Sequence, residues 1–272
     1  MNGEGGTLDA PPAAPPLAKR SSNRWQGALL PAALLLLLEA VVRAGWVPRH
    51  LLPAPSDLLS TLGSLGWATV LQHVGASSLR VAVGFAAGAT LALLLGATVG
   101  LSRRAEALLD PSFQALRAIP SLAWVPLLLL WLGIDEAPKL VLIAIGAFFP
   151  VYMGVASGLR DVDRKLVEVA RLVGLPPLAL ARRVLLPAAL PAVMTGLRNG
   201  LSLAWMFMVA AELIAATRGL GYLLTDGRET GRADLVLVAI VLLALLGKLS
   251  DGIAAALEKR WLSWRDAFES AR

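Results

Sequence analysis

The chain has 272 residues, of which 57% are hydrophobic and only 16% are charged, and its mean hydropathy is +0.68. Soluble globular domains carry roughly 25% charged residues, so this composition excludes an ordinary soluble domain and indicates a protein of the lipid bilayer. The formal charge of +6 forms no concentrated patch of the kind that binds nucleic acid, and the lack of cysteine excludes disulfides and thiolate metal sites.

The N-terminal segment, residues 1–24, is rich in Gly, Pro and Ala. Such a segment cannot bury enough apolar surface to order itself, so we predict a disordered cytoplasmic tail. Its basic residues begin only at Lys19, and no small-residue cleavage site follows them. We therefore expect no signal peptide, and we assign residues 25–272 to one transmembrane domain.

The apolar stretches predict six membrane-spanning helices. Three of them are free of charge and near the roughly 20 residues that cross about 30 Å of hydrocarbon. The other three are shorter or carry polar residues. The predicted spans are Trp25–Val42, Val81–Ser102, Ala118–Ile134, Leu140–Leu159, Pro191–Ala215 and Leu235–Ala255.

The distribution of Lys and Arg predicts the orientation of these spans. With both termini on one side, that side receives fifteen of these residues and the opposite side seven. Cytoplasmic loops carry the excess of Lys and Arg, so both termini are predicted to be cytoplasmic. The loop 160–187 lies on the same side.

The segment Arg43–Leu79 is too polar to cross the membrane. Ser56 and Asp57 give a helix-start signal, and the leucines that follow are spaced for one helical face. We predict a helix here that either lies on the outer membrane surface or packs on the spans of its own chain.

The loop 160–187 combines charge, glycine and proline. Charged and apolar residues alternate from Asp161 to Val173 with the period of a short amphipathic helix. Gly174 stands where a left-handed C-cap would fall, and Pro176 and Pro177 can begin a second helix but cannot continue the first. We expect helix, sharp turn, helix on the cytoplasmic face; a purely structural turn is the alternative.

The spacing in this loop resembles a known signature. The residues E-V-A, Gly174 after three more positions, and V-x-L-P after a further nine match the E-A-A, x3, G, x9, I-x-L-P signature of ABC importer permeases, with Val169 and Val184 as conservative departures. The resemblance implies an all-α, six-span type I importer fold whose coupling helix inserts in a groove of the ATPase subunit. The implied coupling residues are Glu168, Ala170, Gly174, Leu175, Val184, Leu186 and Pro187.

The resemblance extends from about Leu51 to Trp264. The stretches G-I-D-E-A-P-K, G-L-R-D-V-D-R-K-L-V-E-V-A-R and A-L-L-G-K-L-S-D are similar to permeases of aliphatic-sulfonate importers. Nitrate, taurine and bicarbonate permeases share much of this pattern and stay as alternatives. The implied partners are a second copy of the chain, two ATPase subunits, and a periplasmic or lipid-anchored binding protein, all at the bacterial inner membrane.

The chain itself lacks a nucleotide site. A P-loop needs a Gly-rich turn that ends in Gly-Lys-Ser/Thr, whereas Gly247-Lys248 is followed by Leu249 inside a span. We therefore expect no enzyme activity and no cofactor in this chain, with ATP and Mg bound by the partner ATPase. His50 and His73 lie in the predicted outer segment, where we expect no metal site.

Polar residues within the fifth predicted span suggest one wall of a pathway. Arg198, Trp205 and Glu212 recur every seventh residue and share one stripe, with Ser202 one turn from Arg198. We predict that this stripe faces the axis of a dimer and attracts an anion. The alternative is that these residues reach the headgroups or pack against a neighbouring helix.

The third predicted span suggests a second wall. Pro120 and Pro126 each remove a backbone donor, which predicts a bent helix whose freed carbonyls face a cavity. Arg117, Ser121 and Trp124 lie on nearby turns and are predicted to line the pathway. A simple packing kink is the alternative.

Two other functional classes fit the sequence less well. An intramembrane protease is disfavoured because no span holds a nucleophile with a base, or paired aspartates. An ATP-independent secondary transporter is the more serious rival. It is disfavoured because only Glu39 and Glu212 are carboxylates clearly within spans and no internal repeat is visible.

Overall fold

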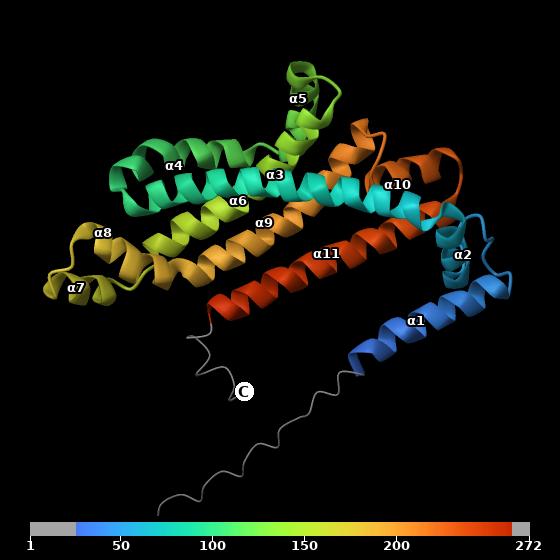
Figure 1. Cartoon of the computed structure of the whole chain (residues 1–272), viewed down its shortest axis with the longest axis horizontal. Helices are drawn as coiled ribbons and strands as arrows, with labels where there is room; N and C mark the ends of the chain where they lie inside the picture. Colours follow the sequence, from blue (N-terminus) through green and yellow to red (C-terminus); the bar gives the residue numbers. More distant parts are fainter. Residues whose placement is uncertain (1–25, 263–272) are drawn as a thin grey trace, which may run out of the picture.

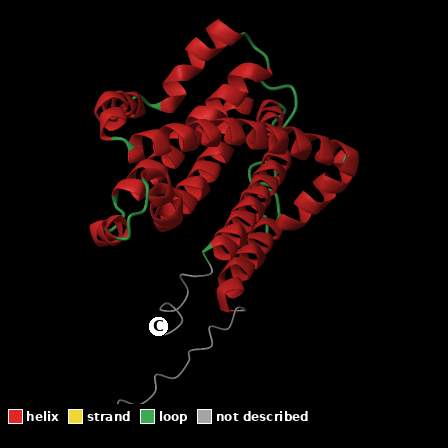
Figure 2. Cartoon of the chain, turned by 60° about the vertical axis from the view of Figure 1, so that its left-hand side comes forward, coloured by secondary structure: helices red, strands yellow, loops and turns green. Residues whose placement is uncertain are grey.

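The computed structural model describes residues 26–262, and these residues form helices and connecting loops without any strand (Figures 1 and 2). The predicted tail 1–24 therefore lies outside the described residues. In chain order the helices are α1 (Gln26–Arg43), α2 (Pro55–Leu65), α3 (Trp67–Leu101), α4 (Arg103–Ala118), η1 (Ser121–Trp124), α5 (Val125–Leu132), α6 (Glu136–Arg160), α7 (Arg164–Leu172), α8 (Pro177–Leu180), η2 (Ala181–Leu185), α9 (Leu186–Ala215), α10 (Leu220–Glu229) and α11 (Ala233–Trp261).

The centre of the bundle is formed by α3, α6 and α9, which run side by side (Figure 1). Glycines let these helices approach closely. A Cβ added to Gly88 of α3 would lie 2.3 Å from the carbonyl oxygen of Ala144 in α6, and one added to Gly154 of α6 would lie 2.8 Å from the Cα of Gly196 in α9. Membrane helices lack a hydrophobic drive to associate, so close packing through small residues holds this centre together.

Four helical stretches have the length and hydropathy of a span: α3, α6, the continuous run Pro177–Ala215, and α11. The pair formed by α4 and the η1–α5 stretch counts as a fifth, bent by 87°. The predicted span Ala118–Ile134 is therefore not one helix. Pro120 lies at the break, and α5 has only 8 residues, or about 12 Å of helix, too short to cross alone. A sixth span would require α1 to cross the membrane as well. Its 18 residues are about 27 Å long, close to the roughly 30 Å of hydrocarbon.

The predicted outer segment Arg43–Leu79 includes the first part of α3. Helix α3 begins at Trp67 and has 35 residues, about 52 Å, so it extends well beyond the hydrocarbon. The predicted helix at Ser56 is confirmed as α2. It packs on its own chain, because Thr61 is buried and its hydroxyl donates to Asp234 of α11 over 2.7 Å.

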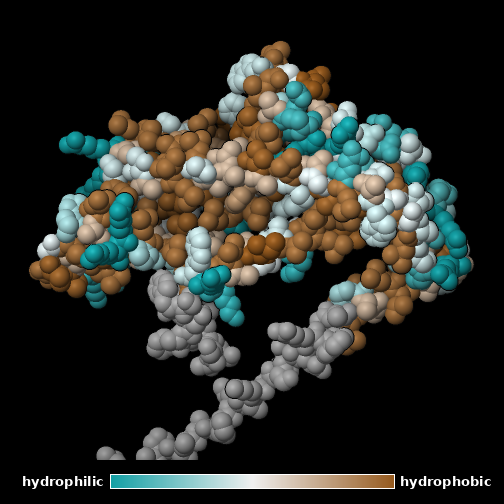
Figure 3. Space-filling view, viewed as in Figure 1, coloured by the Kyte–Doolittle hydropathy of each residue, from teal (hydrophilic) through white to brown (hydrophobic). Residues whose placement is uncertain are grey.

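Helix α1 stands apart from the centre of the bundle (Figure 1). Its contact with α2 is made by Glu39, whose carboxylate accepts from the backbone N–H of Ser56 over 3.0 Å and from its hydroxyl over 2.7 Å. The acceptor therefore lies at the N-terminal end of α2, where backbone N–H groups lack helical partners. Figure 3 shows hydrophobic residues over the middle of the bundle and hydrophilic residues at the α2–α10 end.

Candidate functional site

The predicted coupling loop folds as helix, turn, helix. The side chain of Asp163 caps α7 by accepting from the N–H of Lys165 over 2.9 Å. At the C-terminal end of α7, the N–H of Gly174 donates to the backbone carbonyl of Arg171 over 2.9 Å, and the N–H of Leu175 donates to the backbone carbonyl of Ala170 over 3.1 Å. This is the Schellman arrangement, and it requires the φ of +77° at Gly174, which glycine adopts without strain.

The turn presents apolar side chains to its surroundings. Leu172 is 87% exposed, Val173 75% and Leu178 66%, and Leu166 and Val169 are also exposed. Figure 3 shows hydrophobic and hydrophilic residues together around α7 and α8. A contiguous exposed apolar surface of this kind is typical of a protein contact site.

The signature residues fall into two groups that the fold brings together. Glu168 is exposed on α7, whereas Ala170 is 6% exposed and faces the chain. Val184, Leu186 and Pro187 lie where η2 joins α9, and α7 contacts η2. We define the coupling surface as α7, α8 and the turn between them.

A π-helical turn links the coupling surface to α9. The N–H of Leu186 donates to the carbonyl of Ala181, five residues earlier, and Pro187 follows with no N–H to donate. The π-turn accommodates this missing donor, and the helix then continues to Ala215. The coupling surface is thus continuous with α9, because Pro177–Ala215, which begins with α8, is one 39-residue helical run.

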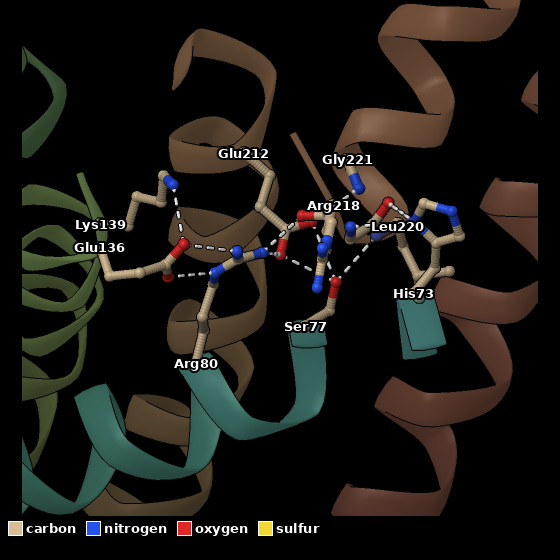
Figure 4. Close-up of polar contacts among 10 residues, drawn as sticks. His73, Ser77, Arg80, Glu136, Lys139, Glu212, Arg218, Leu220 and Gly221 are labelled. Carbon is tan, nitrogen blue, oxygen red and sulfur yellow. Dashed lines mark hydrogen bonds and ion pairs between the residues drawn. The ribbon is translucent and has the colours of Figure 1, made fainter. Parts of the chain in front are cut away.

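At the opposite end of the bundle, an ionic network that is buried except at the half-exposed Glu136 joins α3, α6 and α9 (Figure 4). The carboxylate of Glu212 accepts from Nη1 of Arg80 over 2.6 Å and from Oγ of Ser77 over 2.8 Å. The Nε and Nη2 of Arg80 donate to Glu136 over 2.6 and 2.7 Å, and Lys139 lies 3.0 Å from the same carboxylate. Sequence reasoning missed the role of Arg80, although a charge within an apolar helix was a usable signal.

The same network fixes the turn between α9 and α10. The N–H of Gly221 donates to Glu212 over 2.8 Å, and the N–H of Gly219 donates to Nδ1 of His73 over 3.0 Å. His73, which belongs to the predicted outer segment, is buried in α3 and stacks on Tyr222. Gly219 has a φ of +125°, and an added Cβ there would lie 2.3 Å from the Glu212 carboxylate. Only glycine fits this position.

The predicted stripe on α9 is engaged within the chain. Arg198 pairs with Asp251 over 2.9 Å and with Glu258 over 2.8 Å, both on α11. Nε1 of Trp205 donates to Ser250 of the same helix over 2.9 Å. Glu212 is 1% exposed within the network above. These contacts favour the packing alternative for Arg198, Trp205 and Glu212. No contact within the described residues supports a pathway role for them, so that role stays a prediction. Ser202, the fourth residue of the predicted wall, is exposed.

The other predicted wall borders a hollow. A groove of about 650 Å³ runs between α4, η1, α6 and α9, and both Arg117 and Ser121 line it. Trp124 lines a separate groove of about 500 Å³, an apolar one bordered by Phe148 and Trp131. The structure thus separates Trp124 from the two residues it was predicted to join. Ser121 and Trp124 both follow the 87° bend at Pro120, and within η1 their side chains line different grooves.

Comparison with known families decides the class of protein. Residues 84–263 match the model of the binding-protein-dependent transport system inner membrane component family. The chain belongs to this family. The matched region contains α6, α9, the coupling surface and every residue that lines the groove.

Relatives of this permease are similar over nearly its whole length. The chain is 44% identical to the "Putative aliphatic sulfonates transport permease protein SsuC" of Escherichia coli K12, over 88% of the chain and 91% of the relative. It is 41% identical to the protein of the same name in Bacillus subtilis 168, over 92% of the chain and 91% of that relative. The taurine transport system permease protein TauC of E. coli K12 is 35% identical over 86% and 87%.

The solved structures of the methionine ABC transporter MetNI, in inward facing conformations, share the fold. The TM-scores are 0.61 and 0.58, the identities are 21% and 23%, and the first match covers 73% of this chain and 98% of the solved one. As a member of this family, the chain is a multi-pass inner-membrane permease that works with ATPase subunits and a binding protein, and it carries no ATPase site of its own.

Proposed function

We propose that this permease imports aliphatic sulfonates. The observation that carries the proposal is the 41–44% identity over about 90% of the chain to two permeases named for aliphatic sulfonates, in two distant bacteria. A taurine permease is 35% identical and a bicarbonate permease 34% identical. Their names give taurine, a sulfonate that also bears an ammonium group, and bicarbonate as the transported substrates, so the ranking by identity favours aliphatic sulfonates among the related substrates.

The assembly has two copies of this chain, two ATPase subunits and an external binding protein. Each copy crosses the membrane six times, α1 included, with both termini and the coupling loop 160–187 in the cytoplasm. The segment 1–24 is a cytoplasmic tail. The excess of Lys and Arg on the side of the coupling surface supports this orientation.

ATP binding drives transport through the coupling surface. The exposed Leu172, Val173 and Leu178 seat in the ATPase subunit, and closure of the two ATPases displaces α7 and α8. The π-turn passes this displacement to α9, which lines the groove, and the groove opens outward to receive the sulfonate from the binding protein. ATP hydrolysis returns it to the inward state, and no bond of the substrate is broken.

The pathway follows the groove that Arg117 and Ser121 line. Consecutive residues of an α-helix are turned by about 100°, and Asn199 lines the groove. Arg198 is therefore directed away from the groove, in keeping with its partners on α11. In this proposal Arg198, Trp205 and Glu212 stabilise the contacts between helices and do not bind the substrate.

Two glycine variants test this proposal. Gly174 and Gly133 both have a φ near +76°, and no atom lies within 4 Å of an added Cβ at either position. Gly174→Asp places a charge on the coupling surface, whereas Gly133→Asp places the same charge at another positive-φ glycine, between α5 and α6. The expected result is that ATPase subunits co-purify with Gly133→Asp but not with Gly174→Asp, and that only Gly133→Asp supports hexanesulfonate uptake.

If the ATPase subunits co-purified equally with both variants, Gly174 would have no role in coupling. Uptake by the wild-type permease that survives inactivation of the ATPase would favour an ATP-independent transporter. Uptake of taurine or bicarbonate in preference to hexanesulfonate would reassign the substrate.

A further inference from the structure

The groove between α4, α6 and α9 has two chemically different halves. At the coupling end its walls are polar or small, and at the opposite end they are apolar. The polar half has Ser157, Thr195 and Asn199; the apolar half has Phe149, Leu203 and Met206. Because α6 and α9 run antiparallel, with Gly154 against Gly196 and Gly146 against Phe207, both helices change character at the same level.

Glycine keeps the groove open. Gly154 and Gly196 form the crossing of α6 and α9, where each Cα lies close to the other helix. Neither residue has a side chain that could fill the hollow beside the crossing. The volume of about 650 Å³ lies within the range of roughly 300–1,000 Å³ found for small-molecule sites.

Arg117 stands near the boundary between the two halves. One turn earlier, the side chain of Gln114 contacts Sδ of Met153 over 3.8 Å, which places this part of α4 beside the middle of α6. Ser121 follows in η1, after the break at Pro120, and lines the same groove. Asn199 reaches the groove from α9 on the other side.

The charge of Arg117 is not compensated by the chain. Arg80, Arg160 and Arg198 each pair with one or more carboxylates. Arg117 has no such partner among the carboxylates of residues 26–262. A charged group in a candidate span is costly and faces a cavity or a partner, and a guanidinium is suited to bind the oxygens of an oxyanion.

We propose that this groove is a transit site for an organic anion with an apolar tail. The anionic head binds Arg117, Ser121 and the amide of Asn199, and the tail lies along Phe149, Leu203 and Met206. The site therefore selects an anion with an attached alkyl chain over a bare inorganic anion. This inference rests on the proposed function, because it takes the sulfonate group as the head.

Uptake by the complete transporter tests the two halves separately. The permease, its ATPase subunits and its binding protein are reconstituted in proteoliposomes, with methanesulfonate and hexanesulfonate as probes. Arg117→Gln is expected to lower the initial uptake of both probes by about tenfold or more, as loss of a charged hydrogen-bonding group does. Arg104→Gln, the same change at an exposed site at the start of α4, is expected to leave both rates within about twofold.

The apolar half is tested by a ratio. Met206→Asn is expected to lower hexanesulfonate uptake about fivefold more than methanesulfonate uptake, because only the longer chain reaches the apolar half. This ratio is independent of the amount of folded protein in the vesicles. An equal effect on both probes, or uptake by Arg117→Gln equal to that of Arg104→Gln, would overturn the transit site.

Labelling provides a readout other than transport. The chain has no cysteine, so Thr195→Cys introduces one thiol into the groove, and Thr230→Cys makes the same change at an exposed site just after α10, outside the groove. The probe is 2-sulfonatoethyl methanethiosulfonate, which is itself an organic sulfonate. Modification of Thr195→Cys is expected to be slowed by excess hexanesulfonate and by Arg117→Gln, and modification of Thr230→Cys is expected to respond to neither.

An unreactive Thr195→Cys in the assembled transporter would show that a second copy fills the groove, and this would overturn the site. If the wild-type transporter carries neither sulfonate, the proposed function fails instead. The groove is then tested by the same Arg117→Gln and Arg104→Gln pair with the anion that is carried. A tenfold loss specific to Arg117→Gln would support the site, and equal rates would overturn it.

Discussion

The buried pair of Arg80 and Glu212 gives the sharpest prediction about stability. The Glu212 side chain has no exposed area and lies 2.6 Å from Nη1 of Arg80. Arg80→Met would leave the carboxylate buried with only neutral donors, Ser77 and the N–H of Gly221. Removal of one partner of a buried pair costs about 3–5 kcal/mol because the other charge is left uncompensated.

The double variant Arg80→Met/Glu212→Met is expected to recover at least about half of this loss. It removes both charges at nearly constant volume, and replacement of a whole buried pair is often close to neutral. Glu136 keeps its contact of 3.0 Å with Lys139 in the double variant, so no second charge is stranded. The two substitutions should therefore be strongly non-additive.

The assay is the temperature at which the detergent-purified transporter loses its monodisperse peak in size-exclusion chromatography. A loss of about 3–5 kcal/mol corresponds to a drop of about 6–20 °C for a chain of this size. Arg228→Met is the matched control, because Arg228 is 73% exposed at the same end of the bundle, and little change is expected. If the double variant lost as much thermal stability as Arg80→Met and Glu212→Met lose in sum, the reasoning would be refuted.

Two further predictions concern helix packing. Gly88→Ala should destabilise the protein by about 1–3 kcal/mol, because the new Cβ would lie 2.3 Å from the backbone carbonyl of Ala144. Gly75→Ala, on the same helix with open space, should be neutral or stabilising by about 0.5–1 kcal/mol; equal effects in a thermal assay would contradict this packing. Arg198→Gln should lower thermal stability more than Asp251→Asn, because it also loses the contact with Glu258, and the two effects should be non-additive because both break the contact between Arg198 and Asp251. A transport defect confined to Arg198→Gln, with stability unchanged, would restore the pathway role that the sequence suggested.

The sequence alone determined the features that depend on local composition and spacing. Hydropathy identified the apolar stretches, and the helix-start signal at Ser56 located α2. The coupling loop was predicted as helix, turn, helix because Gly174 and the prolines after it act on their own backbone. These signals require no knowledge of distant parts of the chain, and the same residues carried the family resemblance.

Only the tertiary structure decided which polar residues meet. Arg80 and Glu212 are 132 positions apart, and Arg198 and Asp251 are 53 apart. A helical period indicates that residues share a stripe, but it does not indicate what the stripe faces, and for this reason the α9 stripe was assigned to a pathway. The bend at Pro120 likewise moved Trp124 away from Arg117. Partners across a membrane bundle are set by helix rotation and crossing, which glycine contacts between helices fix and which no local pattern encodes.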